Sequence, residues 1–244
     1  MTTEALEALM TFKFTNNIPR RDAGVAVTVV RGVSGAAPLP PGTEEELRGL
    51  LAAAGARVLS AAEEARRQAC RAILRNGGYK PTGRGKPASE YLLGAAREGS
   101  FPRVNAPVDV NNLISLKYLL PISLWDAELC SSSEFEFRLG RPEESYVFNP
   151  SGQELDLEDL VCGCELAGGA SRPVVTPIKD GMRTKIRPAT VTVISAVYYP
   201  AELMSGTEIE AVNSEFLEKL LGLAPGTSGA KALLPPGAAA VLEL

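Results

Sequence analysis

Histidine is absent from the 244-residue sequence, and this absence excludes several classes of enzyme. Without an imidazole the chain can form neither a Ser-His-Asp triad nor a Cys-His pair, and it has no histidine general base. Long hydrophobic runs are also absent, because no stretch approaches the roughly eighteen apolar residues of a membrane span. We therefore expect a protein that has no membrane partner.

Cysteine is scarce, and its spacing favours a reducing compartment. The four cysteines, at 70, 130, 162 and 164, form no dense framework of the kind that disulfides stabilise. Cys162 and Cys164 could hold a metal only with help from carboxylates, and the alternative is that they are ordinary, partly buried thiols. We expect no metal and no cofactor. The N-terminus is acidic before it is apolar and is unlike a secretory signal, so we expect a cytoplasmic protein.

The charge is unevenly distributed. The whole chain carries a formal net charge of −4, which argues against a protein that coats nucleic acid. Residues 63–103 carry a net charge of +5 and residues 172–187 one of +4, whereas residues 128–165 between them carry −8. Two basic segments fit a local contact with a polyanion. A solvated helix face and a charged hairpin would give the same pattern, so charge alone leaves both interpretations open.

Strand and helix signals are both present but do not alternate along the chain, which predicts a mixed α+β fold. Ser60 and Glu63 have the spacing of a capping box, and Thr43 begins another acidic helix start. The predicted strands are 11–15, 23–30, 135–140, 145–148, 154–166, 173–181 and 189–199, with a loop at 167–171, and the predicted helices begin near 43 and 60 and span 87–98, 110–119 and 207–222. We expect one domain over residues 1–205, followed by a C-terminal helix and a loosely docked tail over 206–244.

The stretch from 77 to 126 holds the densest set of unusual residues. Lys80, Arg84 and Lys86 lie among glycine and proline, a composition typical of a loop that contacts phosphate. The loop is not a Walker A motif, because Pro87 follows Lys86. Upstream, arginines recur along the helix that begins at Ser60, so we expect its solvent face to be basic: Arg66, Arg67, Arg71 and Arg75. The composition of the loop fits a contact with a polyanion.

One part of this stretch resembles a known family. Residues 101–126, FPRVNAPVDVNNLISLKYLLPISLWD, resemble the editing module, or B-three/four domain, of the bacterial phenylalanyl-tRNA synthetase β subunit. The runs KPTGRGKPASEYLL and PVVTPIKDGMRTK resemble freestanding B-three/four proteins, and the resemblance covers roughly residues 24–200. It implies a B-three/four-like editing-domain fold, with a mixed or antiparallel sheet and flanking helices. It also implies an aminoacyl-tRNA deacylase that edits a mischarged tRNA in trans and binds its aminoacylated 3′ end.

The resemblance also implies site residues. Asn111 and Asn112 fall on a Thr-Asn pair of the synthetase pocket, and Ser123 stands where that pocket has a histidine. Asp109 and Asp126 match acids of the synthetase stretch, and Gly168-Gly169 match the glycines of a late loop. The late glutamate that recognises the tyrosine hydroxyl has no counterpart, because Ile194 lies near its place.

From these residues we expect a site that orients a water and donates hydrogen bonds to an oxyanion. The expected catalytic residues are Asn112, Asn111 and Ser123, the substrate-binding ones Asn105, Asp109, Ser115, Gly168 and Gly169, and the RNA-binding ones Lys80, Arg84, Lys86 and Arg103. Helix capping by the amides and Asp109, and packing by the serine hydroxyls, are the alternative interpretations. Two other functions stay open: a non-catalytic tRNA- or RNA-binding module of the same fold, and a small-molecule amino-acid-binding protein.

Overall fold

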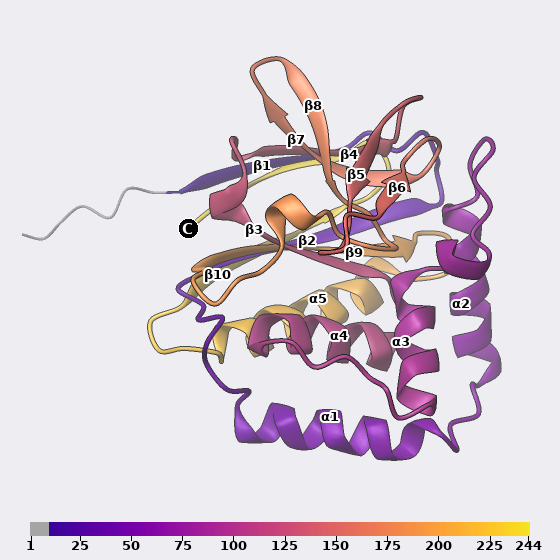
Figure 1. Cartoon of the computed structure of the whole chain (residues 1–244), viewed down its shortest axis with the longest axis vertical. Helices are drawn as coiled ribbons and strands as arrows, with labels where there is room; N and C mark the ends of the chain where they lie inside the picture. Colours follow the sequence, from indigo (N-terminus) through magenta and orange to yellow (C-terminus); the bar gives the residue numbers. More distant parts are fainter. Residues whose placement is uncertain (1–9) are drawn as a thin grey trace, which may run out of the picture.

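The computed structural model describes residues 10–244 and has an α+β fold (Figure 1). Residues 1–9, on which the expectation about a secretory signal rests, lie outside the described range. The helices are α1 (Pro41–Ala54), α2 (Ala61–Ile73), α3 (Ala88–Arg97), α4 (Ala106–Tyr118) and α5 (Gly206–Leu221). None of these helices is long and apolar enough to cross a bilayer.

The strands form two main sheets and a small hairpin. They are β1 (Thr11–Asn16), β2 (Ala23–Arg31), β3 (Ile122–Asp126), β4 (Glu134–Leu139), β5 (Ser145–Val147), β6 (Glu154–Asp156), β7 (Val161–Ala167), β8 (Ala170–Val175), β9 (Thr192–Pro200), β10 (Ser228–Leu234) and β11 (Ala239–Glu243). One sheet has the order β11-β1-β4-β7-β8, the other β10-β2-β9-β3, and β5 pairs with β6. Only the β1–β4 pair is parallel among the ladders of the described residues.

The two sheets and the helices form three layers, with the helices against one face of the four-stranded sheet (Figure 1). One apolar core lies between the sheets, where Phe14 and Phe135 stack with their ring centroids 5.6 Å apart. A second core lies between the four-stranded sheet and the helices and includes Leu113 and Phe216. Burial of this apolar surface supplies most of the driving force for folding.

The sequence of strand β2 is a nearly continuous apolar run, because β2 belongs to the middle layer of the fold. Successive side chains of a strand point to opposite faces of the sheet. Val25, Val27 and Val29 enter the core between the sheets, whereas Ala26 and Val30 enter the core under the helices. Because both faces are covered, every residue but the last is buried, and the sequence shows no alternation of polar and apolar residues.

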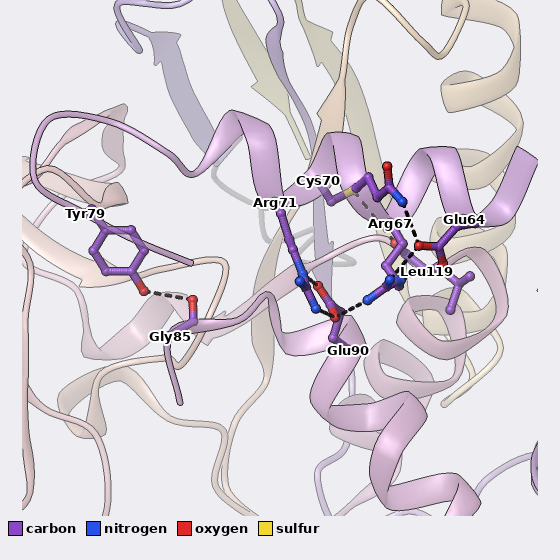
Figure 2. A network of polar contacts seen from close by, with 9 residues as sticks. Glu64, Arg67, Cys70, Arg71, Tyr79, Gly85, Glu90 and Leu119 are labelled. Atoms are coloured by element: carbon purple, nitrogen blue, oxygen red, sulfur yellow. Dashed lines mark hydrogen bonds and ion pairs between the residues drawn. The ribbon is translucent and has the colours of Figure 1, made fainter. Parts of the chain in front are cut away.

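A polar network holds α2 against α3 (Figure 2). The carboxylate of Glu90 in α3 accepts hydrogen bonds from Arg67, at 2.8 Å, and from Arg71, both in α2. Arg67 also pairs with Glu64 at 2.6 Å, while Arg66 donates to the carbonyl of Tyr118. Three of the four arginines that were expected to form a free basic face are therefore committed to partners within the chain.

The strong local signals of the sequence are confirmed. Ser60 and Glu63 make both hydrogen bonds of a capping box, and helices follow close to the expected residues. Helix α4 begins earlier than expected, at Ala106, because Asn105 caps it. The α+β class is confirmed, and the B-three/four fold stays a prediction.

The expectation of a loosely docked tail is wrong. Strand β10 pairs antiparallel with β2 over seven residues, and β11 pairs with β1 over five. Strand β11 is thus an outer strand of the five-stranded sheet, and β10 is an outer strand of the four-stranded sheet. Each outer strand satisfies backbone groups that would otherwise be exposed on an edge.

Candidate functional site

A cavity of about 820 Å³ lies between α3, α4, β3 and the segment 176–186. We call it the main cavity. Its volume is within the range of small-molecule sites, about 300–1,000 Å³. The wall combines apolar side chains such as Leu92 and Ile122 with amides, carboxylates and cations. It therefore has the mixture of shape and convergent polar groups that ligand sites require.

Helix α4 contributes two adjacent amides to the main cavity. Asn111 and Asn112 both line it, and Nδ2 of Asn111 donates to Oδ1 of Asn112 at 3.3 Å. Oδ1 of Asn111 is buried and has no hydrogen-bond partner among the described residues. An unpaired buried acceptor costs roughly 1–3 kcal/mol unless a ligand or water satisfies it. Asn105 has a different role, because its Oδ1 accepts from the Val108 N–H as the cap of α4.

Strand β3 turns its alternate side chains in opposite directions. Ile122 and Leu124 line the main cavity, whereas Ser123 lies on the other face of the strand and is fully buried. The Ser123 hydroxyl donates to the carbonyl of Thr176 at 2.9 Å and lies 3.3 Å from the Tyr198 hydroxyl. This placement favours a role in holding the segment 176–186 against β3 rather than contact with a substrate.

Several other residues named from the sequence make contacts within the fold. Asp109 accepts from Arg103 at 2.7 Å and from the Val104 N–H, and Arg103 also pairs with Glu44. The Ser115 hydroxyl donates to the Leu120 carbonyl at 2.7 Å, so it holds the C-terminal end of α4. None of Asp109, Ser115 and Arg103 lines the main cavity. These contacts match the structural alternatives for Asp109 and Ser115, and they commit Arg103 to Asp109 and Glu44.

The pair Gly168-Gly169 lies away from the main cavity, at the turn between β7 and β8. Both residues have positive φ angles, +58° and +78°, which a two-residue hairpin turn of the primed type requires. Both residues are exposed at the tip of the hairpin. The glycines therefore have a sufficient structural reason in the turn itself.

The basic loop does lie at the site. Arg84 and Lys86 line the main cavity, and both are exposed. Arg84 also lines a neighbouring open cavity of about 1180 Å³, together with Lys80. Within residues 10–244, neither Arg84 nor Lys86 forms an ion pair. Tyr79 steadies the loop by donating its hydroxyl to the Gly85 carbonyl at 2.9 Å (Figure 2).

Three charged residues of the segment 176–186 line the main cavity but were not among the expected site residues: Lys179, Asp180 and Lys185. Oδ2 of Asp180 accepts from the Leu124 N–H at 3.2 Å, at the free edge of β3. Its Oδ1 is buried and has no partner among the described residues. Burial raises the pKa of Asp180 to about 7, against the opposing effects of the Leu124 N–H, Ser123 and Lys185. The only signal in the sequence was a single acid within the basic segment 172–187.

The cysteines play no part in the main cavity. None of the four lines it, and Cys70, Cys162 and Cys164 are buried. Burial raises the pKa of Cys70 and that of Cys164 to about 12. Such thiols stay protonated and are poor nucleophiles.

The fold and the cavity together define an α+β protein with one mixed-polarity site between helices and a sheet edge. No protein-family model matches the chain. The phenylalanine–tRNA ligase β subunit of Onion yellows phytoplasma (strain OY-M) is 26% identical over 124 residues, which are 50% of this chain and 14% of that subunit. The chain is therefore distantly related to this subunit, and the match spans a small part of the relative's length.

Proposed function

We propose that this protein hydrolyses the ester that joins an amino acid to the 3′ end of a mischarged tRNA, acting in trans. The observation that carries the proposal is the composition of the main cavity, in which Asn111 and Asn112 are combined with Arg84, Lys86 and Lys185. The amides suit an aminoacyl group, and the cations suit the phosphates next to it. The distant relation to a tRNA ligase subunit supports the same substrate class.

Hydrolysis of an aminoacyl ester requires few catalytic groups. An aminoacyl ester is already activated, so a site needs to orient a water and donate hydrogen bonds to the oxyanion that forms. Asn112 can be such a donor, because its Oδ1 accepts from Asn111 and its Nδ2 donates no hydrogen bond within residues 10–244. The unpaired Oδ1 of Asn111 can accept from the α-ammonium or a side-chain hydroxyl of the substrate. A substrate without that donor would leave the amide unpaired and bind less well.

The first experiment is a deacylation screen with a panel of cognate and mischarged aminoacyl-tRNAs, following loss of the ester over time. Rapid hydrolysis of one or a few members is the expected result and identifies the substrate. We expect Asn112→Ala to lower the rate by about 10²-fold or more with tRNA binding intact. Asn17→Ala is the control, because Asn17 is an exposed amide that donates to Glu136 outside the main cavity. If Asn112→Ala hydrolyses at the wild-type rate, the assignment of the amide is wrong.

The two other functions make different predictions in the same assays. A non-catalytic RNA-binding module uses the cations alone, so it binds tRNA at low salt and hydrolyses no member of the panel. An amino-acid-binding protein uses the amides alone, so it binds a free amino acid and shows no salt-dependent binding of tRNA.

A further inference from the structure

Hydrolysis of an ester is faster when a protein group accepts a proton from the attacking water. The amides and the serine named above cannot fill that role near neutral pH, since an amide has no basic lone pair and a hydroxyl is a weak base. The chain contains no histidine. If the proposed function holds, the proton acceptor must be another side chain of the main cavity.

Lysine is a poor candidate for this acceptor. Burial and the charges of Arg84 and Lys185 lower the pKa of Lys179. Its ammonium nevertheless lies 3.9 Å from the centroid of the Phe148 ring, an attraction that only the charged form gains. A charged ammonium cannot accept a proton. The cysteines lie outside the cavity, as described above.

Three carboxylates line the main cavity in the part of the chain that the structure describes: Glu90, Glu98 and Asp180. Glu90 is held by Arg67 and Arg71, so both of its oxygens already accept hydrogen bonds within the fold. Glu98 is exposed at the C-terminal cap of α3, so nothing in the fold fixes its carboxylate toward a substrate. Asp180 alone combines a place in the wall with a buried oxygen that has no partner.

The surroundings of Asp180 fix one carboxylate oxygen and leave the other without a partner among the described residues. Oδ2 is held by the Leu124 N–H. The Ser123 hydroxyl is engaged by the Thr176 carbonyl, so Ser123 supports the backbone on which Asp180 is mounted. The other charged or titratable groups that act on the carboxyl are Lys185, Tyr146 and Tyr198. Oδ1 has no hydrogen-bond partner among the described residues, so it can accept a proton from a water that reaches it from the main cavity.

We infer that Asp180 is the general base of the proposed hydrolysis, with Oδ1 as the atom that accepts the proton. A water attacks the ester carbonyl carbon while Oδ1 takes one of its protons, and a tetrahedral intermediate forms. The bond from that carbon to the ribose oxygen then breaks, and the proton on Asp180 passes to the leaving ribose oxygen. The products are the free amino acid and a tRNA with a free hydroxyl, and Asp180 is an anion again.

The pKa of the carboxyl suits this role. A base works best when its pKa is near the working pH, because it is then both unprotonated and able to accept a proton. Burial raises the pKa of Asp180 to about 7. The rate should therefore rise about tenfold per pH unit below about pH 7 and level off above it.

The test uses the aminoacyl-tRNA that the wild-type chain hydrolyses fastest, with the rate without enzyme subtracted. Asp180→Asn keeps an acceptor for the Leu124 N–H but removes the base. We expect it to lower kcat by about 10²- to 10⁴-fold, to leave tRNA binding intact and to abolish the inflection of the pH profile. Glu98→Gln is the matched change at a carboxylate of the same cavity, and it should retain the inflection.

The outcomes separate this inference from the proposed function. If the wild-type chain hydrolyses no aminoacyl-tRNA, the proposed function fails and the role of Asp180 fails with it. If the wild-type chain is active and Asp180→Asn has the same rate and pH profile, only the role of Asp180 is refuted. The pH profile of the wild-type chain is a second test that does not depend on whether the variant folds. A wild-type rate that rises in proportion to hydroxide across the whole pH range would also refute the role of Asp180.

Discussion

The two walls of the main cavity treat charge in opposite ways. On the α3 wall, Glu90 is matched by Arg67 and Arg71 of α2. On the opposite wall, Asp180 has a buried oxygen that finds no partner within residues 10–244, although Lys185 acts on the carboxyl through space. The first wall satisfies the charge of Glu90 inside the fold, whereas the second leaves one oxygen of Asp180 without a partner among the described residues.

The net charge of a segment does not show which of its cations are paired within the fold. The arginines of α2 and the basic loop contribute to the same net charge of residues 63–103. The structure shows that Arg67 and Arg71 hold two helices together, whereas Arg84 and Lys86 stay exposed. Only cations without partners in the fold are available to neutralise phosphates. Four experiments test whether the two walls and their cations differ in this way.

The largest expected effect is on stability at the Asp180 wall. A folded-state pKa of about 7, raised from 3.8, means that the folded chain holds this proton more tightly than the unfolded chain. Stability is therefore lost as the pH rises from about 4 to about 7, by up to on the order of 4 kcal/mol. Asp180→Asn removes the titration, so its Tm should exceed that of the wild type at about pH 8 and approach it at about pH 5. Parallel curves of Tm against pH would contradict the raised pKa.

On the opposite wall the same kind of substitution should have the opposite sign. Glu90→Gln takes the negative charge from between Arg67 and Arg71, and the side chain of Glu90 is only 8% exposed. We expect a loss of about 2–3 kcal/mol, below the cost of a fully buried pair because the arginines can reach water. Thermal unfolding near neutral pH measures it. Glu98→Gln on the same helix is the control and should change stability by less than about 0.5 kcal/mol.

The sequence predicts those parts of the fold that depend on neighbouring residues. The capping box of Ser60 and Glu63 and the apolar run of β2 are local signals, and both are confirmed. Strands β10 and β11 could not be predicted in this way, because their pairing with β2 and β1 joins opposite ends of the chain. Their alanines and glycines become strand residues only when the partner strands are in place.

The candidate site was predictable only in part, for the same reason. The loop with Arg84 and Lys86 and the amides of α4 lie close together in sequence, and the structure brings them to one cavity. Asp180 lines that cavity because the segment 176–186, which follows β8, lies against the free edge of β3. Its burial and its unpaired oxygen are products of this tertiary contact. No local pattern distinguishes Asp180 from a surface acid in a basic segment.

A third experiment compares cations from the two groups. Arg84→Ala, Lys86→Ala and Lys185→Ala should each weaken tRNA binding by about 1 kcal/mol, roughly fivefold. Each should also reduce the slope of log K against log salt by about one. Arg67→Ala should lower the Tm and leave that slope unchanged, since its guanidinium is engaged by Glu64 and Glu90. Equal slopes for Arg67→Ala and Arg84→Ala would remove the distinction between structural and available cations.

A hydrogen bond within the basic loop should have a smaller effect than its cations. The Tyr79 hydroxyl is the donor to the Gly85 carbonyl, and burial raises the pKa of Tyr79 to about 12, so it stays protonated at neutral pH. Tyr79→Phe removes this hydrogen bond and little else, which should cost about 0.5–1.5 kcal/mol of stability. If the bond holds Arg84 in place for phosphate, tRNA binding should weaken as well, by less than Arg84→Ala weakens it. If binding is unchanged while stability falls, the loop presents its cations without help from Tyr79.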